Sequence, residues 1–262
     1  MSDRIVQCSQ LGNFGRFGNQ LFQYVFARSY AEKYDAVLEI PEWIGEKVFK
    51  NVTHRRLAHN LPKTKIDDIP WGAVNIDLFG YFQTKKCFDI LSRNKIKDWL
   101  ILNDNLLKCS NAYKKEVVAH LRRGDYATNM SNIYCVVSEA SYINACKQFG
   151  IDFEQITWLS EENPTVNHQM TDISYRETKN SMYGQGTYDD KGISFLPDFL
   201  TMVNAKILLR SNSSFSFWAG FLNNKKVFSP VVKGKVGWND VDFIEGNSSS
   251  LSNLTDDIII GE

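Results

Sequence analysis

Hydrophobic residues recur along this chain at the two spacings that distinguish buried strands from amphipathic helices. Short runs of branched residues predict strands, and apolar stripes at intervals of three and four residues predict helices. The predicted strands cover residues 5–8, 37–40, 74–82, 117–123, 156–159, 206–210 and 227–229. The predicted helices cover residues 21–34, 88–102, 138–148 and 195–204, with a further helix after residue 216. This alternation of strand and helix is typical of an α/β protein with parallel sheets.

The alternating pattern falls into two halves, which are joined by a polar run over residues 103–115. Two such halves predict a doubly wound architecture with a cleft between two domains. We expect an N-terminal domain over residues 1–108 and a C-terminal domain over residues 109–262. Residues 42–70 and 164–197 show no regular pattern, and the sequence assigns neither segment a role.

A buried strand that ends in two arginines is the most informative feature of the sequence. The stretch VVAHLRRGDY at residues 117–126 begins apolar and then presents His120, Arg122 and Arg123. Alternation along a strand places His120 and Arg122 on one face and Arg123 on the other. Open α/β sheets bind ligands at the carboxyl ends of their strands, and the guanidinium fork suits a phosphate group. The pattern favours an anion site, whereas an Arg-Arg pair alone would fit a solvated strand end.

A second polar turn follows the strand predicted at residues 206–210. Asn212, Ser213, Ser214 and Ser216 lie where that strand passes into a helix, so hydroxyls and backbone N–H groups would converge there. Helix capping explains one serine, but not four small polar residues in five positions. The turn therefore favours anion binding slightly over capping alone.

A glycine-rich loop between the first strand and the first helix is the third candidate site. Its sequence is LGNFGRFGN at residues 11–19, which lacks the full GxGxxG spacing of dinucleotide-binding loops. Arg16, Asn19 and Gln20 supply polar side chains where such a loop would face a cleft. A flexible connection is the alternative interpretation.

Composition narrows the classes of function. The 262 residues include 30 basic and 30 acidic side chains, so no global basic field favours nucleic acid as a partner. Five cysteines without CxxC spacing predict reduced thiols in a cytosol-like compartment. The sequence contains no signal-peptide pattern and no apolar run of about 18 residues, so we expect a soluble cytoplasmic protein.

Three blocks of the sequence together resemble glycosyltransferase family 11, the α-1,2-fucosyltransferases. They are GRFGNQLFQYVFA at 15–27, HLRRGDY at 120–126 and DFLTMVNAKILLRSNSSFSFWAGFL at 198–222. The family shares the second block with α-1,6- and protein O-fucosyltransferases. The resemblance implies a GT-B-like α/β fold, in which two Rossmann-like domains face each other across a cleft. It also implies GDP-L-fucose as donor substrate, inversion at the sugar carbon, and neither a metal nor a cofactor.

The resemblance further implies roles for the matched residues. Arg122 would bind the donor diphosphate with support from Arg123, and we count both, with Asp125, as expected catalytic residues. The residues expected to bind the donor are His120, Arg122, Asp198, Asn212, Ser213, Ser214 and Ser216. The residues expected on the acceptor side of the cleft are Gly15, Arg16, Gly18, Asn19 and Gln20.

An inverting transfer also needs a base for the acceptor hydroxyl, and the sequence does not identify one. The adjacent arginines would depress the pKa of Asp125, so we expect this carboxylate to orient them or the turn. Glu139, Glu161 and Asp198 are the other carboxylate candidates.

Three alternatives stay open at this point. Asp240-Val241-Asp242 has the DxD spacing of metal-dependent GT-A transferases, which would lose activity in EDTA. The same fold with a different GDP-sugar is the second alternative, and a non-catalytic glycan- or nucleotide-binding module is the third. The expected partners are a nucleotide sugar and a glycan acceptor, and a lipid-linked acceptor would add peripheral contact with a membrane. The sequence does not predict the acceptor, the linkage or the oligomeric state.

Overall fold

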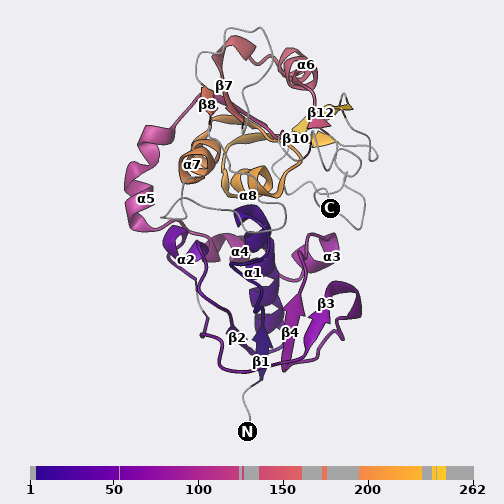
Figure 1. The fold of residues 1–262 in the computed structure, drawn as a ribbon. Helices are drawn as coiled ribbons and strands as arrows, with labels where there is room; N and C mark the ends of the chain where they lie inside the picture. The colour runs from indigo at the N-terminus through magenta and orange to yellow at the C-terminus, as the bar shows by residue number, and fades with distance from the viewer. Residues whose placement is uncertain are drawn as a thin grey trace. The chain divides into compact units, whose positions relative to one another are not determined.

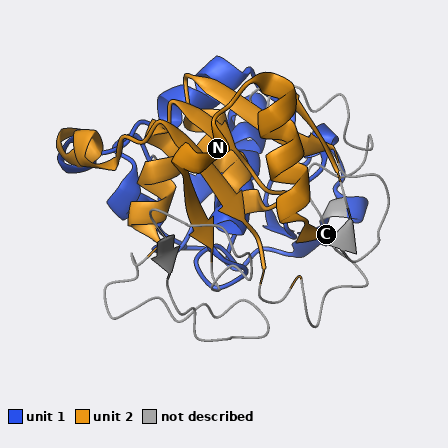
Figure 2. Cartoon of the chain, turned by 90° about the horizontal axis from the view of Figure 1, so that it is seen from above, with its two compact units in different colours: residues 1–107, 180–188 blue, residues 108–179, 189–262 orange. Residues whose placement is uncertain are grey.

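A computed structural model describes residues 4–52, 54–123, 126, 136–160, 173–175, 195–231, 238–239 and 241–245. The chain divides into two compact units, the first with the described residues through Leu107 and the second with those from Lys108 onward (Figure 2). Each unit contains its own sheet (Figure 1). No helix in the described ranges is long and apolar enough to span a bilayer.

The first unit is built on a four-stranded sheet in the order β2-β1-β4-β3, in which every neighbouring pair is parallel. Its strands are β1 (Ile5–Gln7), β2 (Val37–Glu39), β3 (Lys63–Lys65) and β4 (Ile76–Phe79). Helix α1 (Phe17–Lys33) connects β1 to β2 and packs on both strands. Leu21, Phe22, Val25 and Phe26 of α1 are buried, as the predicted apolar stripe requires.

The helix predicted over residues 88–102 is wrong in extent. The structure has two shorter helices there, α3 (Lys85–Phe88) and α4 (Arg93–Trp99). Thr84 and Ser92 are their N-caps, and each side-chain hydroxyl accepts a hydrogen bond from a backbone N–H of its own helix. Each polar cap starts a separate helix, so the continuous apolar stripe did not indicate one continuous helix.

Several further elements occupy segments that the sequence left as loops. The polar run expected to link the halves contains α5 (Asp104–Cys109) and the 3-10 helix η2 (Ser110–Tyr113). The unassigned residues 42–70 contain β3, α2 (Gly45–Val48) and the 3-10 helix η1 (Ile66–Asp68). Strand β8 (Ile173–Tyr175) lies in the segment expected to be irregular, most of which lies outside the described residues.

The second unit contains a six-stranded sheet in the order β12-β10-β9-β5-β7-β8, and all neighbouring pairs are parallel except β10 with β12. The strands not yet introduced are β5 (Val117–Leu121), β7 (Ile156–Ser160), β9 (Ile207–Leu209), β10 (Lys226–Val231) and β12 (Asp242–Glu245). A separate parallel pair consists of β6 (Val136–Val137) and β11 (Trp238–Asn239).

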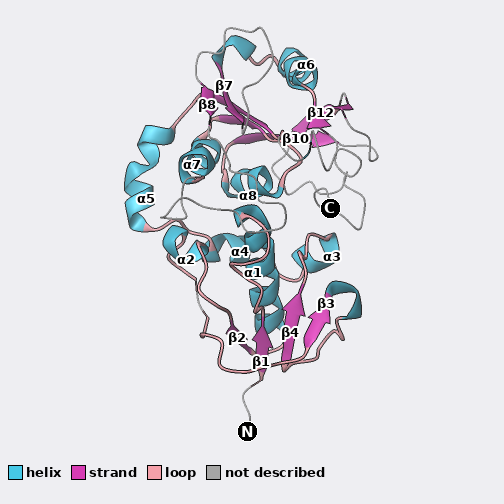
Figure 3. Cartoon of the chain, viewed as in Figure 1, coloured by secondary structure: helices cyan, strands magenta, loops and turns pink. Residues whose placement is uncertain are grey.

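Helices cover both faces of the six-stranded sheet (Figure 3). Helix α6 (Glu139–Phe149) lies on one face, and α7 (Leu196–Asn204) and α8 (Ser214–Leu222) lie on the other, while the 3-10 helix η4 (Phe153–Gln155) precedes β7. Val117, Ala119 and Leu121 of β5 join the core beneath α6, whereas His120 contacts Phe215 of α8. A strand covered on both faces reads as nearly continuous apolar sequence, as β5 does.

Candidate functional site

The candidate site of the second unit lies at the carboxyl edge of its sheet. Strands β5 and β9 are parallel neighbours, with Ala119 opposite Leu209. Arg122 directly follows β5, and Asn212 lies in the turn after β9. Both residues therefore lie at the same edge of the sheet. This is the edge at which open α/β sheets bind ligands.

His120 ties the two strand ends together from inside the protein. Its Nδ1 atom lies 2.8 Å from Oγ of Ser211, and its carbonyl oxygen accepts a hydrogen bond of 2.7 Å from the hydroxyl of Tyr142. Burial, followed by the charges of Arg122 and Arg123, lowers the pKa of His120 to about 3. His120 is therefore neutral at neutral pH and supports the edge by hydrogen bonding rather than by charge.

The two arginines after β5 are both buried, but they have different surroundings. The guanidinium of Arg122 lies 4.6 Å from the ring centroid of Tyr126. Arg123 donates hydrogen bonds to the carbonyl oxygens of Arg122 and Val137, at 3.1 and 3.0 Å. Its Nη2 atom also lies 3.0 Å from Oε1 of Glu139. Arg123 thus connects the end of β5 to Val137 of β6 and to Glu139 of α6.

The serine-rich turn is organised by hydrogen bonds among its own hydroxyls. Ser213 is the N-cap of α8, and its Oγ accepts from the backbone N–H of Ser216 at 3.3 Å. The Oγ atom of Ser216 donates to the carbonyl of Ser211 at 2.9 Å, and the Oγ of Ser211 donates to Ser213 at 3.2 Å. Capping and this network account for three hydroxyls, while Asn212 is buried and Ser214 half-buried beside them.

Arg210, the residue before Ser211, is hydrogen-bonded to the turn and stabilises it. The sequence did not predict this role. Its Nε atom donates to Oγ of Ser229 at 2.7 Å, and its Nη1 atom donates to the carbonyl of Ser211 at 3.2 Å. Burial lowers the pKa of Arg210 to about 10, so it still carries its charge at neutral pH. A charged residue just before a polar turn was the available sequence signal.

Phe215 is a second residue that sequence reasoning missed, although it lies inside the SNSSFS turn. Its ring centroid lies 5.8 Å from that of His120, 6.0 Å from that of Phe195 and 5.5 Å from that of Phe199. The last two contacts bring the N-terminal end of α7, with the half-buried Asp198 in its first turn, next to that of α8. The expected donor-binding elements therefore meet around one aromatic ring, whereas Asp125 lies outside the described residues.

The glycine-rich loop of the first unit is held by side chains that turn inward. Gln20 is 1% exposed, and its Nε2 atom donates to the carbonyl of Gly15 at 2.9 Å. The Gln20 amide therefore points toward the loop backbone. Its position beside an expected cleft had predicted an amide at the surface. Asn19 accepts a hydrogen bond from Gln83 at 2.7 Å and is half-buried. Arg16, the half-buried N-cap of α1, is the loop residue with a long polar side chain near the surface.

Gly15 is required by this loop for both backbone conformation and space. Its φ angle is +78°, and a Cβ atom at this position would lie 2.7 Å from the Cβ of Asn19. We expect Gly15→Val to destabilise the protein by about 1–3 kcal/mol, because a branched residue is strained at positive φ. Urea unfolding of the variant measures this loss. Gly150→Val is the control, since Gly150 also has a positive φ angle, +64°, but a Cβ there meets nothing within 4 Å. An equal loss in both variants would mean that the contact with Asn19 adds nothing to the backbone strain.

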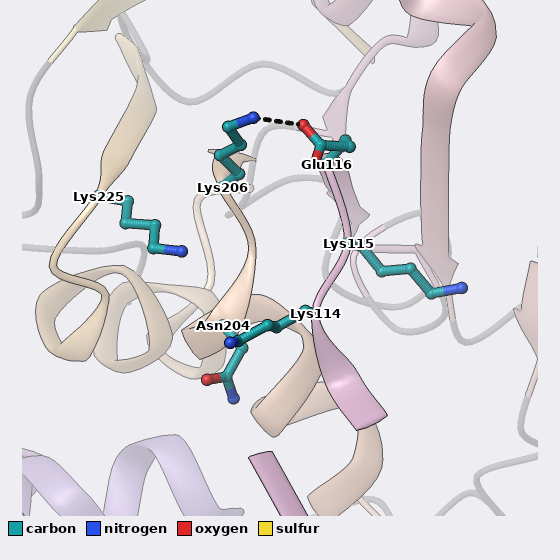
Figure 4. A pocket seen from close by; sticks show the side chains of 6 residues that line it. All are labelled: Lys114, Lys115, Glu116, Asn204, Lys206 and Lys225. Carbon is teal, nitrogen blue, oxygen red and sulfur yellow. Dashed lines mark hydrogen bonds and ion pairs between the residues drawn. The ribbon is translucent and has the colours of Figure 1, made fainter. Parts of the chain in front are cut away.

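A lysine-lined pocket of about 330 Å³ opens at the opposite, amino-terminal edge of the second unit's sheet (Figure 4). The side chains that line it are Lys114, Lys115, Glu116, Asn204, Lys206 and Lys225. Lys206 forms an ion pair of 2.9 Å with Glu116. None of the expected donor-binding residues lines this pocket, so it is separate from the candidate site at the carboxyl edge.

A largely parallel α/β unit with arginines and a helix N-terminus at one sheet edge is typical of nucleotide- and phosphate-binding proteins. The sequence model of "Glycosyl transferase family 11" matches residues 59–244, and the chain belongs to this family. The fold agrees with two crystal structures of the fucosyltransferase NodZ, one titled as an α-1,6-fucosyltransferase soaked with GDP-fucose and the other from Bradyrhizobium. In both comparisons the TM-score is 0.55, the identity is 12%, and the alignment covers 94% of this chain and 100% of the other. The predictions of family and of an α/β, GT-B-like fold are confirmed.

A similar protein is named an α-1,2-colitosyltransferase and comes from Escherichia coli. The two sequences are 25% identical in an alignment of length 170, which covers 57% of this chain. The match spans about half, 52%, of that protein's length.

Proposed function

We propose that the protein is an inverting, metal-independent glycosyltransferase that moves L-fucose from GDP-L-fucose to a hydroxyl of a glycan acceptor, in α-1,2 linkage. The observation that carries this proposal is the convergence of Arg122, His120 and the N-terminus of α8 at one sheet edge. In this proposal the C-terminal domain, residues 109–262, binds the nucleotide sugar. The N-terminal domain, residues 1–108, binds the acceptor through Arg16 and the loop around Gly15 and Gly18.

The chemistry of the leaving group supports this assignment. Breaking the bond between the sugar and the diphosphate leaves negative charge on the diphosphate, which must be stabilised as it develops. A metal ion is one solution, and a fixed guanidinium together with a helix N-terminus is another. Arg122 is a permanently charged donor that directly follows β5, and α8, with Ser213 as its N-cap, begins at Ser214, five residues after β9 ends at Leu209.

The similar proteins are named for two different donor sugars. Family membership and the fold of NodZ favour fucose, whereas the E. coli relative is named for colitose. We therefore keep a different GDP-sugar as the second candidate function. The cytoplasmic location, and peripheral contact with a membrane for a lipid-linked acceptor, are part of the proposal.

The proposal is tested by measuring GDP release from GDP-fucose, GDP-mannose and GDP-colitose, with and without a panel of free disaccharides. We expect the fastest acceptor-dependent release with GDP-fucose, and the same rate in EDTA because no metal takes part. Faster release from another GDP-sugar would move the assignment to the second candidate. GDP binding without release from any donor would show a non-catalytic binding module, and loss of activity in EDTA would refute the metal-free mechanism.

A further inference from the structure

The second unit contains a buried arginine whose charge the proposed function does not use. Arg210 directly follows β9 at the carboxyl edge of the sheet, and it is 3% exposed. Its Nε atom donates to Oγ of Ser229 in β10 at 2.7 Å, and its Nη1 atom donates to the carbonyl oxygen of Ser211 at 3.2 Å. Both acceptors are uncharged, so these hydrogen bonds do not neutralise the positive charge of the guanidinium.

Arg123 shows how a guanidinium is neutralised in the same unit. It is 5% exposed, and its Nη2 atom lies 3.0 Å from Oε1 of Glu139. Among the residues that the structure describes, no carboxylate forms an ion pair with Arg210. Burial lowers the pKa of Arg210 to about 10, so the side chain remains charged at neutral pH. A buried charge without an ionic partner costs stability, which hydrogen bonds offset only in part.

The N-terminal end of α8 raises this electrostatic cost further. The guanidinium of Arg210 lies 5.6 Å from the ring centroid of Phe217, the fourth residue of α8. The N-terminus of a helix carries a partial positive charge, which disfavours a nearby cation and favours an anion. The first turn of α8 contains no acidic residue. The contact with the aromatic ring is weakly favourable, but it does not neutralise the two positive charges at this edge.

An anion at this edge would remove both costs. Ser211, which accepts from Arg210, precedes the N-cap Ser213 by two residues, so the guanidinium lies one hydrogen bond from the turn that leads into α8. The diphosphate of the proposed donor supplies the required negative charge, and open α/β sheets bind ligands at this edge. Charges interact more strongly in a low-dielectric interior than in water, so Arg210 can act on the diphosphate without touching it.

We propose that the buried charge of Arg210 stabilises the bound diphosphate of the donor and sets the preference of the site for a doubly phosphorylated nucleotide. This inference rests on the proposed function, in which Arg122 binds the diphosphate directly. Arg210 is a positioning residue, because it orients the Ser211 carbonyl and adds positive potential beneath the turn. Since the effect is electrostatic, it should grow with the number of charges on the ligand.

The test measures the affinities of the full chain for GDP and GMP by calorimetry. Arg210→Gln removes the charge, whereas its amide can still donate to the Ser211 carbonyl. We expect this variant to lose a factor of about ten or more in affinity for GDP and a smaller factor for GMP. Ser229→Ala keeps the charge and removes one hydrogen bond, so its GDP affinity should stay within about threefold of the wild type.

Lys225→Gln is the control for net charge. Lys225 lines the pocket at the opposite, amino-terminal edge of the same sheet (Figure 4), so this variant removes one positive charge away from the proposed donor site. Its affinities for GDP and GMP should stay within about twofold of the wild type. Urea unfolding without ligand checks that each variant is folded. Little loss of stability is expected in Arg210→Gln, because the charge that it removes is costly to bury.

Unchanged GDP affinity in Arg210→Gln would overturn the inference, as would equal losses for GDP and GMP. A loss in Ser229→Ala as large as that in Arg210→Gln would assign the effect to hydrogen bonding and would also overturn it. If Arg210→Gln does not fold, Arg210→Met repeats the comparison with a neutral side chain, and failure of both to fold would assign Arg210 to the fold alone, against the inference. A wild-type protein that binds neither nucleotide refutes the proposed function together with the inference, whereas the other outcomes leave the proposed function standing.

Discussion

Arg122→Ala is expected to lower sugar transfer about 100- to 1000-fold while the protein remains folded. The physical reason is that a fixed hydrogen-bond donor, aimed at the charge that develops on the diphosphate, lowers the activation free energy by about 3–4 kcal/mol. Arg122 follows β5 directly and contacts Tyr126, and both residues are buried, so the guanidinium is held in place. GDP release from GDP-fucose in the presence of an acceptor measures the effect, and thermal unfolding checks that the variant is folded.

Two variants make the Arg122 result specific. Arg122→Lys keeps a positive charge but loses the planar fork, so we expect a loss of at least about tenfold. Arg4→Ala removes a guanidinium that donates to the carbonyl of Tyr34 in the first unit, and it should leave activity unchanged. An Arg122→Ala protein that folds and transfers at a near-normal rate would remove Arg122 from the donor site and, with it, the central support for the proposed function.

The elements that sequence patterning predicted are those whose local signal agrees with their packing. Strands β1, β5 and β7 are buried apolar runs, and α6 begins with the cap Ser138, whose Oγ accepts from Ser141 N–H at 3.2 Å. Strand β3 has the sequence Lys-Thr-Lys at the edge of its sheet, and its exposed lysines carry no apolar pattern. Such a strand forms because β4 offers a pairing edge, which is a tertiary cause that no local window contains.

The candidate site also combines features that the local sequence predicts with features that depend on tertiary structure. The strand-then-turn pattern was enough to place Arg122 and the serine turn at sheet edges, because parallel strands bring their carboxyl ends together. The bond between His120 and Ser211 spans 91 residues, and it depends on β5 and β9 being neighbours, which the sequence order does not state. The inward orientation of Gln20 was not evident from the sequence, because it depends on the loop placing the carbonyl group of Gly15 where the Gln20 amide can donate to it.

Acidification is expected to destabilise the second unit through His120. The pKa of this histidine is about 3 in the folded protein, against 6.5 for the ordinary side chain, because burial and then Arg122 and Arg123 disfavour its charge. Between these two values the unfolded chain binds more protons, so the stability contributed by neutral His120 is complete above pH 6.5 and falls as the pH drops towards 3. From pH 7 to pH 4.5 the loss is on the order of 2–3 kcal/mol.

The variant His120→Asn isolates this contribution, since its amide can still donate to Ser211 but does not titrate. Urea unfolding at pH 7 and at pH 4.5 should show wild type losing more stability than the variant by that amount, because carboxylate effects are common to both. Equal losses would mean that His120 titrates normally and that its burial is less complete than the structure indicates. In the wild type, protonation would place a third positive charge beside Arg122 and Arg123, at the sheet edge where His120 is hydrogen-bonded to Ser211. Loss of GDP binding should therefore follow the same pH dependence as loss of stability.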